Sequence, residues 1–328
     1  IYELFNLRPG DSLLGVLPFF HSFGFTATLW LPLLCSMKAV YHHNPFDAAK
    51  VGELISTEKV KVFMSTPTFL LAYIRKCRKE QFRTLEYVIT GAEKLKDRIA
   101  QAFFDKFGIF PMEGYGCTEL SPVAALNVPN YIDSVMTQVG HKPGTVGHPI
   151  PGVAARIVDI DTLSLLPPDV EGLLQIKGPN VMLGYLNNKE KTDEVIVDGW
   201  YNTGDIAKID EDGFITITDR LSRFSKIAGE MVPHQKIEEA IHSALGESET
   251  ICAVSAVEDE SRGEKLVVLI TKEVVVGDLN KKLQEGGMPN LWIPKAENYF
   301  MVEGLPLLGT GKLDLKEIKR KAKELSGS

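Results

Sequence analysis

The feature that most constrains the fold is a long run without charged side chains near the start of the chain. No Asp, Glu, Lys or Arg occurs from Ser12 to Met37, and this run is longer than the ~20 residues that a helix needs to span a bilayer. Glycine and proline interrupt it repeatedly, which argues for two shorter buried elements instead. We predict a buried strand over Leu13–Phe20 and a buried helix over Phe25–Leu34. No transmembrane segment is therefore expected.

Strand and helix signals alternate through the rest of the first half. Apolar, β-branched runs predict strands at Lys38–His42, Val60–Ser65 and Leu85–Thr90, and amphipathic spacing predicts helices at Ala48–Thr57 and Lys94–Phe107. The second of these helices ends at Gly108, a residue suited to a left-handed cap. Alternation of this kind is typical of a parallel sheet clad in helices.

The pattern changes after about Val139. Short alternating strands are expected at Ala154–Val158, Leu173–Ile176, Asp205–Ile209 and Phe214–Thr218, which suggests a small antiparallel barrel or sheet. A compact α+β segment follows Arg220, with helices at His234–Leu245 and near Leu313–Leu325 and strands at Ile251–Val257, Leu266–Thr271 and Tyr299–Val302. We therefore predict an α/β chain in three parts, at residues 1–138, 139–220 and 221–328.

The amino-acid composition argues against several classes of function and site. The formal net charge of -7 argues against nucleic acid as the main partner. The four cysteines lie far apart without a CxxC pair, which fits a reducing compartment and neither a zinc site nor a disulfide framework. No signal peptide is recognisable, and we expect sequence upstream of Ile1 because the chain starts at what reads as the end of a helix.

The run Gly114-Tyr115-Gly116-Cys117-Thr118-Glu119 suits a nucleotide. Tyr115 can stack on a purine face, and the hydroxyl of Thr118 can hydrogen-bond a phosphate oxygen. The Glu119 carboxylate can hold Mg²⁺, a hard cation that prefers oxygen ligands. A glycine-rich run of this length also occurs in ordinary turns, so its interpretation depends on other motifs.

Two further motifs offer groups for a nucleotide. Asp205 ends the run Trp200–Asp205 at the predicted start of a strand, and Arg220 follows Asp219 directly after another strand. Acceptor and donor groups of this kind could hydrogen-bond to ribose hydroxyls. Taken singly, Asp205 is more often a turn residue, and Asp219 with Arg220 a surface ion pair.

Gly91, Ala92 and Glu93 follow a predicted strand, where open α/β sheets bind ligands. Their backbone could line the edge of an adenine. The alternative is a simple turn from a strand to a helix.

Lys312 lies on a glycine-rich loop, Leu308–Lys312. A phosphate-binding P-loop would need a glycine where Pro306 stands and a Ser or Thr where Leu313 stands, so that interpretation fails.

His42 and Asp47 have the His-x4-Asp spacing of glycerolipid acyltransferases. Asp47 is better explained as the N-cap of the helix that follows.

The motifs taken together resemble the adenylate-forming acyl ligases, a superfamily that includes acyl-CoA synthetases, nonribosomal-peptide adenylation domains and luciferase. The resemblance covers essentially the whole chain and rests on segments in the family's order: Pro18–Gly24, Thr90–Glu93, Gly114–Glu119, Gly199–Asp205, Asp219-Arg220, Lys226–Gly229 and Gly309–Lys312. It implies ATP/AMP and Mg²⁺ as cofactors. It also implies two steps, in which a fatty carboxylate first forms an acyl-adenylate and a thiol then takes the acyl group.

The resemblance also implies roles for single residues. Tyr115 with Gly116 would bind adenine, Asp205 and Arg220 the ribose, and Glu119 Mg²⁺. Thr118 would contact the α-phosphate or acyl oxygen, and Lys312 would bridge the reacting carboxylate and phosphate. His21 would lie beside the acyl carboxylate, and Lys226 would line the path of the thiol after the C-terminal domain swivels. Ser222 stands at the family's hinge position, where many members have a charged residue.

A narrower resemblance concerns Leu221–His234. This segment looks like the ligase part of the bacterial bifunctional acyl-carrier-protein synthetase/2-acylglycerophosphoethanolamine acyltransferases. The implied partners are a fatty acid, acyl carrier protein or coenzyme A as thiol, and a lysophospholipid for the full-length protein. The implied location is the cytoplasmic face of the bacterial inner membrane.

One expected motif is absent from the printed sequence. The family's Ser/Thr/Gly-rich phosphate loop normally precedes Pro18–Gly24, and we expect it upstream of Ile1. We therefore expect this chain alone to bind adenylate weakly and to catalyse poorly. Two other classes stay open: a non-catalytic nucleotide-binding module, and a lipid acyltransferase acting through His42 and Asp47.

Overall fold

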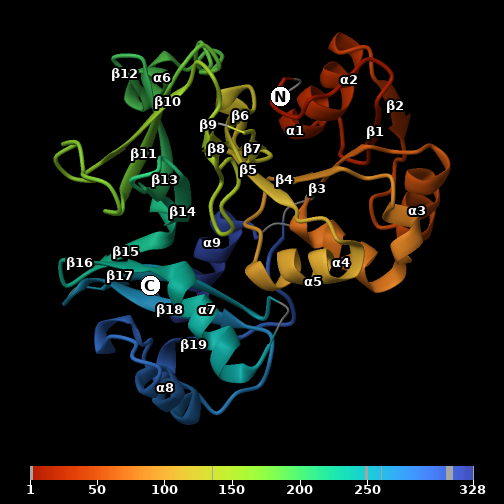
Figure 1. Cartoon of the computed structure of the whole chain (residues 1–328). Coiled ribbons are helices and arrows are strands. Elements are labelled where there is room, and N and C mark those ends of the chain that lie inside the picture. The colour runs from red at the N-terminus through yellow and green to blue at the C-terminus, as the bar shows by residue number, and fades with distance from the viewer. Residues whose placement is uncertain (1–2, 135, 248–249, 260, 308–312, 328) are drawn as a thin grey trace. The chain divides into compact units, whose positions relative to one another are not determined.

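A computed structural model describes residues 3–134, 136–247, 250–259, 261–307 and 313–327 (Figure 1). The chain forms two compact units, Ile1–Thr218 and Asp219–Ser328, and each is described by itself. The finer division of the first unit at residue 138 stays a prediction.

The first unit is built on a seven-stranded sheet in the order β2-β1-β3-β4-β5-β6-β9. Its strands are β1 (Ser12–Gly15), β2 (Lys38–Tyr41), β3 (Val62–Ser65), β4 (Tyr87–Thr90), β5 (Met112–Gly116), β6 (Val123–Leu126) and β9 (His148–Pro149). Neighbours from β2 to β5 are parallel, whereas β6 is antiparallel to both β5 and β9. The predicted α/β fold with a parallel sheet is confirmed.

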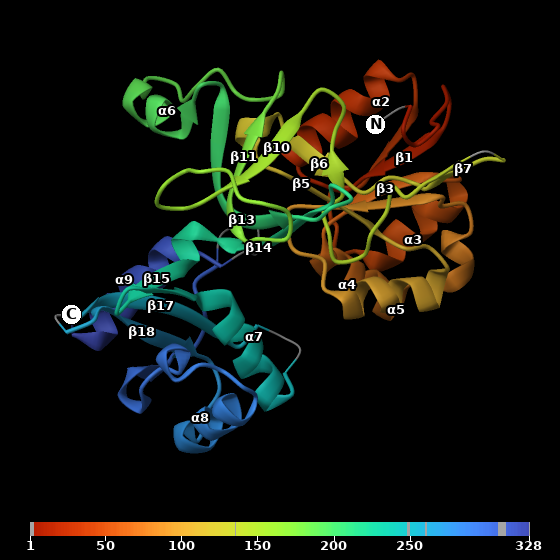
Figure 2. The ribbon, with the colours of Figure 1, turned by 60° about the vertical axis from the view of Figure 1, so that its left-hand side comes forward.

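Three helices cover one face of this sheet: α3 (Ala48–Thr57), α4 (Pro67–Lys76) and α5 (Asp97–Phe107) (Figure 2). Successive strand residues point to opposite faces, so Leu14 and Phe63 pack beneath these helices while Leu13 and Val62 pack on the other side. The short 3-10 helix η2 (Lys79–Phe82) follows α4. Helix α4 was not predicted, although the proline at its first position is a recognised start signal.

The elements of the charge-free run differ from the prediction in their bounds and in their burial. The strand β1 ends at Gly15, and the helical stretch consists of α1 (Ser22–Gly24), the π-helix η1 (Phe25–Trp30) and α2 (Leu31–Leu34). Its apolar side chains are not all buried, since Leu33 is 62% exposed and Leu34 76%. The prediction of a buried helix was wrong here because a uniformly apolar run does not show which face packs; within Phe25–Leu34 the buried residues are Ala27, Thr28 and Pro32.

A second sheet belongs to the first unit, except for the last two residues of its final strand, which fall in the second unit. It contains β10 (Ala154–Val158), β11 (Gly172–Lys177), β12 (Ile196–Val197), β13 (Trp200–Ile209) and β14 (Ile215–Arg220), with α6 (Lys189–Val195) before β12. The pairs β10·β11 and β11·β13 are antiparallel, as predicted. The pair β12·β13 is also antiparallel, although no strand was predicted at β12. The short strands β7 (Tyr131–Ile132) and β8 (Thr137–Gln138) form a separate ribbon.

The position predicted for Asp205 within its strand was wrong. Asp205 lies in the middle of β13, which begins at Trp200. Gly204, with φ +70°, reads as a turn in the sequence, but the strand passes through it because the ladder with β11 shifts register between Leu173 and Gln175. Such a bulge re-aims the side chains beside it.

The second unit is a sheet between helices. The hairpin β15 (Phe224–Ile227) and β16 (Glu230–Pro233) precedes the sheet of β17 (Cys252–Asp259), β18 (Gly263–Ile270) and β19 (Tyr299–Met301). The helices are α7 (His234–Leu245), α8 (Val276–Glu285) and α9 (Leu315–Ser326), with 3-10 turns η4 (Leu221–Arg223), η5 (Asn290–Trp292) and η6 (Ala296–Asn298).

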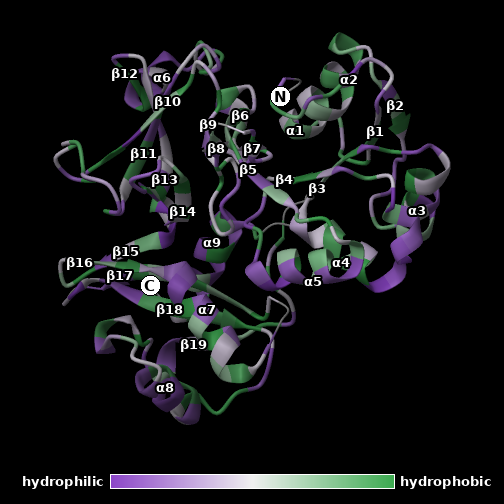
Figure 3. Ribbon diagram, viewed as in Figure 1, coloured by the Kyte–Doolittle hydropathy of each residue, from purple (hydrophilic) through white to green (hydrophobic). Residues whose placement is uncertain are grey.

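Alternating residues of this sheet face different helices. Val254 and Val268 pack with α7 and α8, and Ala253 and Val267 pack with α9. Figure 3 shows that α8 carries mostly hydrophilic residues, whereas β18 is largely hydrophobic. Among the described residues, no helix has the length and apolarity needed to cross a bilayer.

Candidate functional site

The structure brings together Tyr115 and Asp205, which lie 90 positions apart in the sequence. The Tyr115 hydroxyl donates to Asp205 Oδ2 at 2.5 Å, joining the end of β5 to the middle of β13. Burial and the neighbouring Asp205 carboxylate raise the pKa of Tyr115 above its ordinary value, so the hydroxyl keeps the proton that it donates. Asp205 is only 6% exposed. Two of the predicted nucleotide motifs therefore form one site.

The loop after Tyr115 is shaped by Gly116. A Cβ at this position would lie 1.7 Å from the carbonyl oxygen of Pro122, so no other residue allows this close return of the chain. The turn η3 (Thr118–Leu120) follows. Thr118 Oγ1 lies 3.3 Å from Ser22 Oγ, within hydrogen-bond distance. The loop thereby meets the start of α1, where two hydroxyl groups face each other.

Glu119 is fixed by residues just before α6. Its Oε1 accepts a hydrogen bond from the Tyr185 hydroxyl at 2.8 Å, and its backbone oxygen accepts from the Met182 N–H at 2.8 Å. No cluster of three or more His, Cys, Asp or Glu side chains suited to a metal occurs among the residues that the structure describes. A single carboxylate fits Mg²⁺, which commonly takes one or two protein carboxylates and completes its shell with water and phosphate oxygens.

Gly91, Ala92 and Glu93 leave the carboxyl end of β4, as predicted. A Cβ at Gly91 would approach the Phe23 ring to 3.3 Å, and Ala92 has a φ of +68°. Glu93 Oε2 accepts from the backbone N–H of Thr68 at 3.3 Å and from its hydroxyl at 2.6 Å. The Glu93 side chain is thus engaged at the start of α4, and the role predicted for this segment rests on its backbone.

The other predicted residues lie as follows. His21 is half-buried and caps α1, because its Nδ1 accepts from the Phe23 N–H at 3.2 Å. Arg220 ends β14, and its backbone N–H donates to Asp219 Oδ1 at 2.7 Å. Lys226 is exposed on β15. Arg220 and Lys226 belong to the second unit, and Lys312 lies outside the described residues.

The acyltransferase spacing was interpreted as helix capping, and the structure confirms the cap. Asp47 Oδ1 accepts from the Lys50 N–H at 3.2 Å at the start of α3. The other carboxylate oxygen lies 3.5 Å from His42 Nε2. The cap alone accounts for an aspartate at this position.

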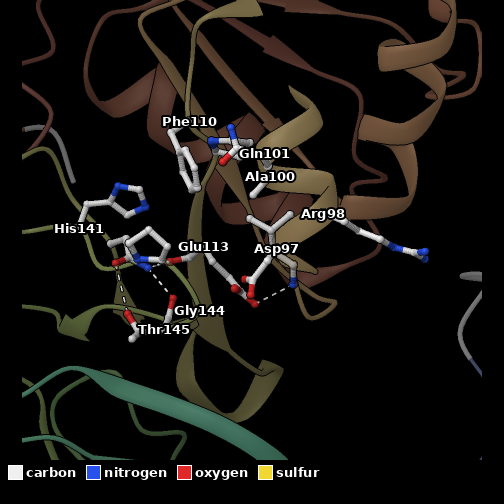
Figure 4. Close-up of a pocket in the computed structure, with 13 residues that line it drawn as sticks. Asp97, Arg98, Ala100, Gln101, Phe110, Glu113, His141, Gly144 and Thr145 are labelled. Carbon is white, nitrogen blue, oxygen red and sulfur yellow. Dashed lines mark hydrogen bonds between the residues drawn. The ribbon is translucent and has the colours of Figure 1, made fainter. Parts of the chain in front are cut away.

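A pocket of about 400 Å³ lies beside β5, between the start of α5 and the loop 141–145 (Figure 4). Glu113, Phe110 and His141 line it. Glu113 is 8% exposed, and its Oε1 accepts from the Leu95 N–H at 3.0 Å. Burial raises the pKa of Glu113 to about 7. The sequence analysis missed this residue, although a carboxylate inside a mostly apolar strand directly before Gly114 was a usable signal.

The second unit holds a buried polar network of its own. Ser225 Oγ lies 2.6 Å from His234 Nε2, and Arg223 pairs with Glu238. Burial lowers the pKa of His234 to about 3, so its ring is neutral near pH 7. Ser225 is 2% exposed and His234 5%, which leaves no room for a substrate at this pair.

Comparison with known proteins identifies the family. A family model described as AMP-binding enzyme matches residues 1–186. The chain belongs to the AMP-binding enzyme family. The predicted resemblance to adenylate-forming ligases is thereby confirmed at the level of the family.

Several relatives in the AMP-binding enzyme family match nearly the whole chain. A probable 4-coumarate–CoA ligase 3 of Dictyostelium discoideum is 32% identical over 97% of this chain and 57% of its own length. A long-chain-fatty-acid–CoA ligase of Salmonella typhimurium is 29% identical over 97% of this chain and 55% of its own length. The chain thus spans just over half the length of these curated relatives.

Solved structures show the same fold. The ATP-bound crystal structure of MatB from Rhodopseudomonas palustris has a TM-score of 0.84 and 26% identity, covering 99% of this chain and 63% of that one. A magnesium- and ATP-bound O-succinylbenzoate coenzyme A synthetase from Bacillus subtilis has a TM-score of 0.79 and 24% identity. The predicted α/β architecture is that of these ligases.

Proposed function

We propose that the full-length protein is an ATP-dependent acid–thiol ligase that activates a fatty acid as its acyl-adenylate. The observation that carries this proposal is the hydrogen bond between Tyr115 and Asp205, because it joins an aromatic ring suited to a base and a carboxylate suited to a ribose. Membership of the AMP-binding enzyme family supports the same conclusion.

The site residues suit an adenylate. The Tyr115 ring would stack on adenine while its hydroxyl donates to Asp205, and the Asp205 carboxylate would accept from a ribose hydroxyl. The backbone of Gly91 and Ala92 would line the base, and Arg220 would complete the ribose contacts. Thr118 would donate to an oxygen on the α-phosphate. Glu119 would hold Mg²⁺, which when bound screens the negative charge of the phosphates.

The chemistry consists of two displacements. A carboxylate oxygen of the fatty acid attacks the α-phosphorus, and pyrophosphate leaves; a thiolate then attacks the acyl carbon, and AMP leaves. Lys312 would bridge the carboxylate and the phosphate, two anions that repel each other. At an effective dielectric of ~20, one cation ~4 Å from each charge contributes about 4 kcal/mol per charge. His21 would lie beside the acyl carboxylate, and Lys226 on the path of the thiol.

We propose acyl carrier protein as the thiol acceptor and reacylation of a lysophospholipid as the use of the thioester. The support is the resemblance of Leu221–His234 to the bifunctional synthetase/acyltransferases. Location at the cytoplasmic face of a bacterial inner membrane belongs to the same proposal. The curated relatives are CoA ligases by name, so coenzyme A is the alternative acceptor.

The test is acid-dependent exchange of labelled pyrophosphate into ATP by the full-length protein. We expect exchange with a long-chain fatty acid, and a loss of about 100-fold or more on Lys312→Ala, because one electrostatic contact in a transition state is worth this much. Thioester formation with carrier protein and with coenzyme A then distinguishes the acceptors.

Two results would contradict the proposal. Nucleotide binding without any acid-dependent exchange would indicate a non-catalytic module. Acyl transfer that needs no ATP and disappears in His42→Ala would indicate the acyltransferase alternative.

A further inference from the structure

We infer that Tyr185 is the positioning residue for Glu119, holding one carboxylate oxygen so that the other faces the metal–nucleotide complex. No comparison with known proteins assigns a role to Tyr185. The inference rests on the proposed function, because it concerns the metal ligand of that same site.

The hydrogen bond is direct and sets the orientation of the carboxylate. Tyr185 Oη lies 2.8 Å from Glu119 Oε1, and the Met182 N–H holds the backbone oxygen of Glu119 at 2.8 Å. The two contacts come from the same short segment, 182–185. Because side chain and backbone are both held, the Glu119 carboxylate has a defined direction, and in this orientation Oε2 would be the oxygen that binds the cation.

The segment that carries Tyr185 is itself fixed. The Tyr185 N–H donates to Thr192 Oγ1 at 2.9 Å, and Thr192 Oγ1 donates to the Asn188 carbonyl at 2.9 Å. Asn188 caps α6 through the Lys191 N–H. Gly184, with φ +150°, lies so close that a Cβ there would meet Thr192 Cγ2 at 2.8 Å. Tyr185 therefore lies on a segment just before α6 that is hydrogen-bonded to that helix.

The side chains on either side of Tyr185 point differently from the tyrosine. Leu183 and Leu186 are 103% and 91% exposed, whereas Tyr185 is half-buried against Glu119. A segment that exposes two leucines and directs the intervening tyrosine to a carboxylate is not arranged for core packing.

A tyrosine is suited to this task because it donates a hydrogen bond without adding positive charge. A lysine or arginine at this position would compete with the cation for Glu119. Groups that orient metal ligands in this way contribute about 10- to 100-fold in metal affinity.

The test measures metal affinity directly in the full-length protein. Mn²⁺, detected by electron paramagnetic resonance, replaces Mg²⁺, and a non-hydrolysable ATP analogue is present. We expect Tyr185→Phe to raise the apparent Kd for Mn²⁺ about tenfold. Tyr131→Phe, at an exposed tyrosine of β7 in the same unit, is the matched control and should leave the Kd unchanged.

A double-mutant cycle shows whether Tyr185 acts through Glu119. In a Glu119→Gln background, Tyr185→Phe should cause no further loss, since the oriented carboxylate is already gone. Kinetics give a second readout: the apparent KM for Mg²⁺ should rise while the KM for the fatty acid stays constant. Thr192→Val, which loosens the segment but keeps the tyrosine, should raise the Kd for Mn²⁺ about threefold.

The outcomes separate this inference from the function itself. Equal Mn²⁺ affinity in Tyr185→Phe and wild type would overturn the inference, as would an undiminished effect in the Glu119→Gln background. If wild type bound no metal–nucleotide complex at all, the proposed function would fail together with the inference.

Discussion

The two units hold buried carboxylates in different ways. In the first unit, tyrosine hydroxyls donate to Asp205 and Glu119, so each carboxylate is oriented but not neutralised by these partners. In the second unit, the buried Glu238 pairs with the guanidinium of Arg223 and also accepts from the Val254 N–H at 2.8 Å. A phenol leaves negative charge available to a ligand, whereas a guanidinium cancels it.

The two kinds of carboxylate should contribute to different properties: those held by tyrosines to ligand binding, and the one paired with arginine to the stability of the fold. An oriented carboxylate with its charge intact is suited to a cation or a sugar hydroxyl. A carboxylate paired inside a core contributes to the fold and offers nothing to a ligand. Substitutions in the two units should therefore affect different quantities, and the following changes test this in order of expected size.

The largest effect on stability is expected for Glu238→Gln. This change leaves the charge of Arg223 buried without its counter-ion, and breaking a buried pair in this way costs about 3–5 kcal/mol. Chemical denaturation monitored by circular dichroism measures the free energy of unfolding. Glu239→Gln, at the next position of α7, is the control and should change it little. A loss below about 0.5 kcal/mol in Glu238→Gln would remove the distinction between the units.

Glu113 gives a carboxyl group of a third kind, held by one backbone N–H. Burial raises its pKa from 4.5 to about 7, so between these pH values the native chain keeps a proton that the unfolded chain releases. The Glu113 carboxyl therefore destabilises the native state increasingly as the pH rises from 4.5 to 7, and by a constant amount above.

The corresponding variant is Glu113→Gln, which keeps an acceptor for the Leu95 N–H. Its stability relative to wild type should rise by roughly 2–3 kcal/mol between pH 4.5 and pH 8. Denaturation curves across this range measure the difference, and Glu211→Gln at an exposed turn is the control. A difference that does not vary with pH would show that Glu113 titrates normally.

A smaller effect is expected for Tyr115→Phe. The ring stays, but Asp205 loses one donor, and we expect a loss of about 1–2 kcal/mol in unfolding free energy. Because the tyrosine does not neutralise the aspartate, this loss should be clearly below that of Glu238→Gln. AMP affinity should also fall, by about three- to tenfold, as measured by calorimetry. Unchanged AMP affinity would show that the hydroxyl does not position Asp205.

Local sequence patterns predicted most of the helices and strands, because apolar spacing and capping residues lie close together in the sequence. The helix Ala48–Thr57 and the strand Ala154–Val158 were predicted with the bounds that the structure has. The strand of Asp205 was predicted too short, because Gly204 reads as a turn and only the partner strand reveals the bulge. The charge-free run shows the same limit, since a uniformly apolar segment does not indicate its exposed face.

The candidate site was also predictable only in part, because some of its residues belong to local motifs and others depend on contacts between distant parts of the sequence. The motif residues Tyr115, Asp205 and Glu119 were recognisable by chemical type and spacing. Tyr185 was not, because its function depends on a contact across 66 positions. Glu113 was also missed: its place in a mostly apolar strand was a signal of burial, but the pocket beside it forms only when α5 and the loop 141–145 pack against β5.

The most direct test of the account is AMP binding by the 328-residue chain, compared between wild type and Asp205→Asn. The variant keeps the shape of the side chain and removes its charge. We predict saturable binding by wild type and at least about a tenfold weaker affinity in the variant, because a hydrogen bond to a charged group is lost. Equal affinities, or no saturable binding by wild type, would contradict the assignment of Tyr115 and Asp205 to a nucleotide site.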